Sequence, residues 1–309
     1  MKKISIVTPT YNEVQNIQEI YEKIKSEFNK LDYSYEHIII DNFSVDGTIE
    51  KIKEIASLDK NVKVIINIKN FGHIRSPFYG LLQSSGDATI LMASDFQDPI
   101  EMIPKYIKQW EKGSKIVLGE KTASEESNLM FSLRKTFYNF LHKISQTKLT
   151  INTTGSGIFD KEVINKIKNV EDPYPYFRGL ISELGYEVNT IKFKQPIRKS
   201  GKTKNNFFTL YDIGMLGVVK HSKLPLRLIT MLGFASSLVS FFIALIYLFY
   251  KLLFWNSFEI GIAPLVIGIF AFASVQILLL GVIGEYVGVM LVHLRKLPLV
   301  IEKERINFD

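Results

Sequence analysis

The sequence predicts an α/β domain with a mainly parallel sheet, followed by an interfacial amphipathic helix and two transmembrane helices. Between residues 4 and 93, short apolar runs alternate with longer helical patterns, as in proteins built from β–α–β units. Further on, 23 residues from Leu228 to Tyr250 and 25 residues from Ile260 to Gly284 carry no charge. Each run exceeds the ~20 residues that a helix needs to cross a hydrocarbon core. The alternative for these two runs is a pair of buried core helices.

The apolar runs of the first domain predict four strands with helices between them. The strands are expected at 4–8, 37–40, 62–66 and 88–93, and the helices at 13–29, from 46 onward and at 73–85. Such an alternation forms a parallel sheet with right-handed crossovers, and ligands bind beyond the carboxyl ends of its strands. Polar clusters follow three of the strands, at 11–13, 41–42 and 95–98. We therefore expect one site at this edge of the sheet.

Composition excludes several classes of protein. The 309 residues include no cysteine, so disulfides, cysteine-based zinc sites and thiol nucleophiles are absent. The net charge of +7 is concentrated between Lys192 and Arg227, where nine Lys and Arg face one acid, Asp212. One local basic strip does not indicate a nucleic-acid partner. The chain also lacks a Gly-x-Gly-x-x-Gly after its first strand, a Gly-Lys-Ser/Thr phosphate loop and a Gly-x-Ser-x-Gly elbow.

Charges beside the two uncharged runs predict the orientation in the membrane. Positive residues precede the first run and follow the second, whereas the linker 251–259 carries one charge of each sign. The positive-inside rule therefore puts both termini and the α/β domain in the cytoplasm. The first apolar run is too short for a signal peptide. Residues 206–222 mix large apolar side chains with Asp212 and Lys220, which predicts a helix in the headgroup plane or, alternatively, one packed on the soluble domain.

Three motifs, taken together with their order and spacing, resemble those of family 2 glycosyltransferases of the nucleotide-sugar-binding GT-A fold. The motifs are Val7 to Glu13, Asp41 to Thr48 and Asp95 to Pro99. Further features resemble the polyprenyl-phosphate glycosyltransferases, relatives of dolichol-phosphate mannose synthase, and in particular their bacterial two-span branch. These features are Arg178-Gly179, the basic run from Arg198 to Lys204, and Pro225 to Arg227 before the first uncharged run. The resemblance covers nearly the whole chain.

The resemblance implies a nucleotide-sugar site, with UDP as the expected nucleotide and GDP as the alternative. An aromatic face and carboxylates suit a base and the ribose hydroxyls. The matching donor-site residues are Pro9, Tyr11, Glu13, Asp41, Asn42, Ser94, Asp95 and Gln97. For Asp41 the alternative is a helix cap for the turn that starts near Ser44.

The resemblance also implies a divalent metal, Mg²⁺ or Mn²⁺. Asp95 corresponds to the metal-binding carboxylate of the family's Asp-x-Asp element, where the ion offsets charge on the leaving diphosphate. Two departures stand out: Ala93 replaces the first Asp of that element, and Asn42 replaces the second Asp of an Asp-Asp pair. Metal binding would then rest on Asp95, with help from Asp98.

The acceptor implied by the resemblance is a lipid phosphate, which needs cations more than a base because it is already ionised. The acceptor-phosphate residues implied are Lys121, Arg134, Arg198, Lys202 and Lys204, and Asp98 and Asp160 are the candidate bases. Asp95, Asp98, Asp160 and Arg134 thus form the expected catalytic set. For Lys202 and Lys204 the alternative is attraction to anionic headgroups, worth ~1 kcal/mol each.

The sequence therefore predicts a hexosyltransferase that moves one sugar, with inversion, from a nucleotide sugar to undecaprenyl phosphate for cell-envelope glycan modification. Alternatives are a processive family 2 polysaccharide synthase and a non-catalytic membrane scaffold. The expected division is a catalytic domain at 1–200, a basic loop and amphipathic helix at 201–226, spans at 227–254 and 260–292, and a cytosolic tail at 293–309. The resemblance implies a homo-oligomer, a tetramer.

Overall fold

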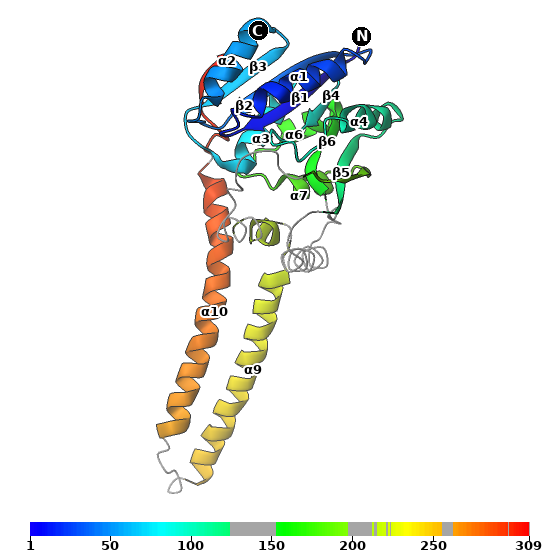
Figure 1. Ribbon diagram of the computed structural model, residues 1–309. Helices are drawn as coiled ribbons and strands as arrows, with labels where there is room; N and C mark the ends of the chain where they lie inside the picture. The colour runs from blue at the N-terminus through cyan, green and yellow to red at the C-terminus, as the bar shows by residue number, and fades with distance from the viewer. Residues whose placement is uncertain are drawn as a thin grey trace.

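The computed structural model describes residues 1–123, 153–196, 212, 215–220, 222, 224–254, 262–295 and 297–308. In these residues an α/β domain carries two long helices that project from it (Figure 1). The sheet of the domain has eight strands in the order β7-β5-β6-β4-β1-β2-β3-β8. The strands are β1 (Lys3–Thr10), β2 (Ser34–Asp41), β3 (Val62–Asn67), β4 (Ala88–Leu91), β5 (Ile116–Ala123), β6 (Thr153–Asp160), β7 (Val188–Lys194) and β8 (Glu302–Ile306).

The first four strands are parallel, as the alternation of strands and helices predicts. Strand β1 pairs with β2 and β4, and β2 pairs with β3, all in parallel register. Strand β6 runs antiparallel to β4 and β5, and β8 runs antiparallel to β3. The carboxyl ends of β1 to β4 therefore share one edge with the first residues of β6 and β8. We call this edge the C-edge.

Helices cover both faces of the sheet. On one face lie α1 (Ile17–Phe28), α2 (Thr48–Leu58) and α4 (Met102–Glu111), which bury Ile20, Ile52 and Tyr106 against the strands. On the other face lie α3 (Gly72–Leu82), α6 (Lys161–Lys168) and α7 (Phe177–Glu183). Alternate residues of β2 serve the two faces: Ile39 packs with α1 and α2, and Ile38 and Ile40 pack toward α3. Isoleucine runs buried on both sides are typical of strands inside a parallel sheet.

The two long helices are α9 (Leu224–Leu253) and α10 (Ile262–Leu294). At ~1.5 Å per residue they extend about 45 and 50 Å, longer than a ~30 Å hydrocarbon core. They contact each other, yet large apolar side chains such as Phe234, Phe249 and Leu278 remain exposed. Within the described residues, the segment Val275–Leu294 is long and apolar enough to cross a membrane, and Leu224–Ser236 is a shorter apolar stretch.

The C-terminal segment, expected as a cytosolic tail, supplies an edge strand to the sheet. After α10 the chain returns to the C-edge, where the Ile68 amide donates to the Ile301 carbonyl at 3.0 Å. Residues Glu302 to Ile306 then pair with β3 as β8. Four of these five residues are charged, as is common in strands that close a sheet edge against aggregation.

The expected amphipathic helix of 206–222 is described at 212, 215–220 and 222. Residues 215–220 are helical, and their Leu216 and Val218 side chains are buried. We call these residues the juxtamembrane helix.

Candidate functional site

The loops that follow β1 and β2 are held together at the C-edge. The Asn12 amide donates to the Ser44 hydroxyl at 2.8 Å, and the Val45 amide donates to Oδ1 of Asn12 at 2.8 Å. Next to this pair, the Glu13 amide donates to the Thr48 hydroxyl at 2.9 Å. Polar cross-links of this kind fix two loops as one surface beyond the strand ends, which is where α/β sheets bind ligands.

Asp41, the last residue of β2, shapes the second of these loops. Its fully buried carboxylate accepts hydrogen bonds from the Ser44 amide at 2.8 Å, from the Ser44 hydroxyl at 2.5 Å and from the Thr10 hydroxyl at 3.3 Å. Burial raises the pKa of Asp41, and these donors oppose that rise. The carboxylate thus closes the turn at Ser44, but it is not a helix cap, because the N-cap of α2 is Gly47 and no side chain caps that helix.

Asn42 uses its whole side-chain amide to hold the loop after β3. Its Oδ1 accepts from the Phe71 amide at 2.9 Å and from Nδ2 of Asn67 at 3.2 Å. Its Nδ2 donates to Oδ1 of Asn70 at 2.8 Å and to the Gly72 carbonyl at 3.2 Å. A carboxylate has no hydrogen to donate to the last two oxygens. The departure from the family's Asp-Asp pair therefore has a structural reason.

Strained backbone is concentrated at the C-edge. Asn12, Phe43 and Phe96 have φ angles of 56°, 71° and 60°, and they follow β1, β2 and β4 respectively. The left-handed region is unfavourable for residues other than glycine, and strain of this kind persists chiefly at functional sites. The fourth such residue in the described part of the chain, Asn307, lies beyond β8. Phe43 is 41% exposed, so its strained loop presents an aromatic side chain to solvent, and Tyr11 in the loop after β1 is half-buried.

The loop after β4 presents two carboxylates with different surroundings. Oδ1 of Asp95 accepts from the Gln97 amide at 3.2 Å, and the Asp95 side chain is partly exposed. Asp98 is buried, and its Oδ2 accepts from the Ser156 hydroxyl at 2.5 Å and from the Ala93 amide at 3.3 Å. Burial raises the pKa of Asp98, the neighbouring Asp95 adds to that rise, and the Ser156 hydroxyl and the Lys121 ammonium oppose it. The loop after β4 thus carries a buried carboxylate, Asp98, and a partly exposed one, Asp95, and the Lys121 ammonium lies near Asp98.

Three comparisons with known proteins bear on what this edge does. The family model for glycosyl transferase family 2 matches residues 5–168. The SfII prophage-derived bactoprenol glucosyl transferase of Shigella flexneri is 31% identical over 304 residues, covering 98% of each chain. A prophage bactoprenol glucosyl transferase homolog of Escherichia coli (strain K12) is 30% identical over 298 residues, covering 96% of this chain and 97% of that one. The chain belongs to glycosyltransferase family 2.

A likeness to solved structures exists but is limited. Glucosyl-3-phosphoglycerate synthase from Mycobacterium tuberculosis, in complex with Mn²⁺, UDP and phosphoglyceric acid, has a TM-score of 0.48 and 18% identity. It covers 71% of this chain and 76% of that one. The assignment to family 2 therefore rests on the sequence comparisons, and with it the chain is a glycosyltransferase with a GT-A-like α/β domain.

The remaining donor-site residues expected in family 2 lie along the same edge. Pro9 is near the end of β1, opposite Ile40 of β2, and Glu13 is buried with its carboxylate accepting from Nδ2 of Asn16 at 2.6 Å. Ser94 is buried and Gln97 is partly exposed in the loop of Asp95. The structure thus brings together eight expected residues: Pro9, Tyr11, Glu13, Asp41, Asn42, Ser94, Asp95 and Gln97.

The donor atoms at this edge fit a divalent ion of the family 2 kind. Among the described residues no three His, Asp or Glu side chains gather as a preformed metal site. Mg²⁺ is often held by one or two carboxylates together with substrate phosphates. Asp98 is buried whereas Asp95 is partly exposed, so Asp95 is the carboxylate better placed to share an ion with a diphosphate.

The structure does not bring Asp160 to this site. Asp160 pairs with Ala88 at the beginning of β4, at the opposite edge of the sheet. Its carboxylate caps α6 through the Glu162 amide at 2.9 Å and accepts from Trp110 Nε1 at 2.8 Å and Lys115 Nζ at 3.1 Å. Burial alone would raise the pKa of Asp160, but these donors hold it below its usual range. This carboxylate stabilises a helix terminus and lies too far from the C-edge to act there as a base.

Four of the five expected acceptor residues, Arg134, Arg198, Lys202 and Lys204, lie outside the described residues. Lys121 is described, in β5, with its charge near Asp98. The sequence analysis did not predict the hydrogen bond from Ser156 to Asp98, nor the position of Arg178 near Gly155. A Cβ built on Gly155 would lie 3.9 Å from Nε of Arg178, so the guanidinium lies over the start of β6. The feature that could have indicated both contacts is the Gly155-Ser156-Gly157 sequence, because a glycine has no side chain and lets neighbouring groups approach the backbone closely.

Proposed function

We propose that this chain transfers one sugar, with inversion, from a UDP-sugar to undecaprenyl phosphate at the cytoplasmic membrane surface. The observation that carries the proposal is the position of the C-edge. After α10 the chain returns to the C-edge, and the loops of the candidate site lie at this same edge. The C-edge and the apolar helices are therefore on the same side of the domain (Figure 1). The names of the bactoprenol glucosyl transferases, matched over nearly their whole length, support the same acceptor.

In this proposal the donor lies across the loops after β1, β2 and β4. The Tyr11 and Phe43 rings provide apolar faces for the base. Glu13 stabilises the loop after β1 by accepting the hydrogen bond from Asn16. Because the Asp41 side chain is fully buried, its role in this proposal is to hold the turn at Ser44 in place. Asn42 holds the neighbouring loop of Phe71.

Asp95 would hold the divalent ion together with the donor diphosphate. Bound there, Mg²⁺ or Mn²⁺ neutralises charge on the diphosphate. Asp98 keeps the loop of Asp95 in register through the Ala93 amide, and its charge is offset by Lys121.

The acceptor phosphate is ionised near neutral pH, so the proposed step needs no general base. A phosphate oxygen forms a bond to the anomeric carbon while the bond from that carbon to the diphosphate oxygen breaks, and its electron pair leaves with UDP. Cations must bring two anions together for this step. Lys121 is the described candidate, and Arg134, Arg198, Lys202 and Lys204 are added by the resemblance.

The membrane part of the proposal has two spans, at 227–254 and 260–292, with residues 1–200 and both termini in the cytoplasm. The lengths of α9 and α10 and their exposed apolar side chains support it. Because the chain has no cysteine, single cysteines report topology. A cysteine at Ser257 should be labelled from outside intact cells, and one at Leu58, on the surface of α2, should not. The reverse pattern would overturn the orientation.

The direct test supplies purified full-length protein with a panel of UDP- and GDP-sugars, Mn²⁺ and a polyprenyl phosphate. Mass spectrometry should find a polyprenyl-phosphate monosaccharide with one of the UDP-sugars. A longer glycan would point to the processive synthase, and no product with any donor would point to the scaffold. Light scattering on the same preparation tests the proposed homo-oligomer.

A further inference from the structure

A single carboxylate, that of Asp172, joins three parts of the molecule. Its two oxygens lie 2.7 and 2.6 Å from Nζ of Lys220 in the juxtamembrane helix. Its Oδ1 also lies 3.2 Å from Nε2 of His293, near the end of α10, and accepts from the Tyr174 amide at 2.9 Å. The catalytic domain, the juxtamembrane helix and α10 thus meet at one side chain.

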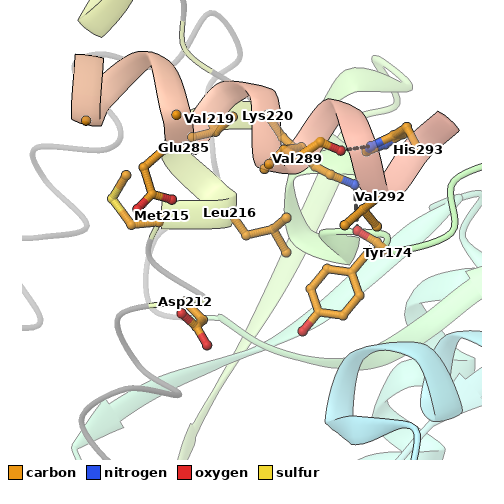
Figure 2. A pocket seen from close by; sticks show the side chains of 13 residues that line it. Tyr174, Asp212, Met215, Leu216, Val219, Lys220, Glu285, Val289, Val292 and His293 are labelled. Carbon is orange, nitrogen blue, oxygen red and sulfur yellow. Dashed lines mark hydrogen bonds between the residues drawn. The ribbon is translucent and has the colours of Figure 1, made fainter. Parts of the chain in front are cut away.

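The surroundings make this junction costly to break. The Lys220 side chain is 9% exposed and makes a further hydrogen bond of 2.5 Å to the Tyr174 carbonyl. Burial lowers the pKa of Lys220, and Asp172 opposes that fall. A buried ammonium that loses its carboxylate is left without compensation for desolvation. Figure 2 shows Lys220 beside Tyr174, and His293 hydrogen-bonded along α10 to the Val289 carbonyl, at 2.9 Å.

A second contact ties the same elements on the membrane side. The Tyr286 hydroxyl of α10 donates to the carbonyl of Ser222 at 2.9 Å. Ser222 is two residues after Lys220 in the sequence. The Ser222 hydroxyl in turn accepts from the Leu224 amide at 3.1 Å, where α9 begins. The direction in which α9 leaves the domain is therefore set by the segment that Asp172 anchors.

The junction is also close in sequence to the candidate site. Tyr176 is buried, and α7 begins at Phe177, five residues after Asp172. Its second residue, Arg178, lies over Gly155, next to the Ser156 that bonds Asp98. The chain from Asp172 to α7 thus connects the juxtamembrane helix to the part of the domain that carries the C-edge.

We propose that Asp172 is a positioning residue for transfer to a membrane-embedded acceptor, holding the C-edge at a fixed place over the bilayer through Lys220 and His293. The inference rests on the proposed function. It predicts that loss of the Asp172 carboxylate slows transfer to a lipid in the membrane and leaves nucleotide binding at the donor site unchanged.

The test compares two acceptors in the full-length protein. Asp172→Asn should lower kcat on long-chain polyprenyl phosphate in lipid vesicles at least tenfold, and lower kcat on a short, water-soluble prenyl phosphate less than threefold. UDP affinity should stay within twofold. Lys220→Met should behave like Asp172→Asn, and Asp172→Glu should retain most of the vesicle activity. Glu171→Gln, an exposed acid beside Asp172, is the matched control and should change nothing.

Equal losses on the two acceptors, an unchanged vesicle rate or a parallel loss of UDP affinity would each overturn the proposal. If wild type transfers sugar to neither acceptor, the proposed function fails, and a distance measurement decides the positioning. Spin labels on cysteines introduced at Glu187 and Leu228, which are exposed sites on the domain and on α9, should give one narrow distance in the wild-type background. Asp172→Asn should broaden it. An equally narrow distribution in the variant would refute the role of Asp172.

Discussion

The Ser156 hydroxyl donates a hydrogen bond of 2.5 Å to Oδ2 of Asp98, joining β6 to the loop after β4. The two residues are 58 positions apart in the sequence, and the antiparallel insertion of β6 beside β4 is what brings them together. Asp98 is buried, so each donor to its carboxylate counts toward keeping it ionised.

Ser156→Ala should therefore slow transfer about tenfold, equivalent to ~1.4 kcal/mol, which is typical for loss of a hydrogen bond to a charged group. Burial already raises the pKa of Asp98, and without the hydroxyl the pKa rises further. The acidic limb of the pH–rate profile should then move to higher pH, so that the deficit shrinks as pH increases. Ser84→Ala, which removes a buried hydroxyl near the opposite edge, should leave the profile in place. A profile unmoved in Ser156→Ala would show that the ionisation of Asp98 does not limit transfer.

Asp95→Asn should reduce transfer at least about 100-fold with the fold intact, because a neutral amide binds a divalent ion far less well than a carboxylate. Calorimetry with UDP should show tighter binding with Mn²⁺ than without it in wild type, and no such difference in the variant. Glu101→Gln changes an exposed acid at the start of α4 and should behave as wild type. Near-normal activity in Asp95→Asn, or a wild type indifferent to EDTA, would remove the metal from Asp95.

Asn42→Asp restores the acid that family 2 usually has at this position, and it should weaken UDP binding. A carboxylate would face Oδ1 of Asn70 and the Gly72 carbonyl, which now accept from Nδ2 of Asn42. Two acceptor pairs without a hydrogen between them repel, so the loop of Phe71 should shift and the UDP dissociation constant should rise roughly five- to thirtyfold. Asn70→Asp alters the same loop at its exposed side and should have a smaller effect. Tighter, more metal-dependent UDP binding in Asn42→Asp would instead mean that position 42 is a lost metal ligand.

The sequence was sufficient to predict the parallel half of the sheet. Buried isoleucine runs mark β1, β2 and β3, and the polar clusters that follow β1, β2 and β4 do lie at one edge of the sheet, the C-edge. It was insufficient for the other four strands, β5 to β8. Strand β6 contains Gly155 and Gly157 among small polar residues, and a Cβ on Gly157 would meet the Val117 carbonyl at 2.1 Å. Such a strand exists because a neighbouring backbone approaches closely, which periodicity does not reveal.

The roles of acidic residues were the hardest part to predict. Asp98 and Asp160 are both candidate bases by resemblance, yet one lies at the C-edge and the other caps α6 at the opposite edge. The direction of β6 decides between them, and direction depends on pairing rather than on composition. Asp172 gave no signal either, since its partners Lys220 and His293 are distant in sequence.

Glu36 should make the stability of the catalytic domain sensitive to acid. It lies near the start of β2, away from the candidate site, with its side chain 2% exposed. The ammonium groups of Lys3 and Lys63 lie 2.8 and 3.0 Å from Oε2, and the Ser5 hydroxyl donates to Oε1 at 2.5 Å. Burial by itself would raise the pKa of Glu36, but hydrogen bonds from Lys3, Ser5, Ser85 and Lys63 outweigh it and lower the pKa to about 2.

Because the folded-state pKa lies below the ordinary value of 4.5, the stabilisation is complete above that value and is lost as pH falls toward 2. A shift of this size corresponds to about 3 kcal/mol at neutral pH and about 1 kcal/mol at pH 3. Glu36→Gln should therefore lower the free energy of unfolding by about 3 kcal/mol at pH 7, and the gap to wild type should narrow to about 1 kcal/mol at pH 3. Urea unfolding of the protein in detergent, followed by tryptophan fluorescence at both pH values, measures this gap. Glu54→Gln, an exposed acid paired with Lys51 on α2, should cost less than about 1 kcal/mol at either pH. A gap that stays constant between pH 7 and pH 3 would mean that Glu36 stabilises the sheet by packing, with its charge playing no part.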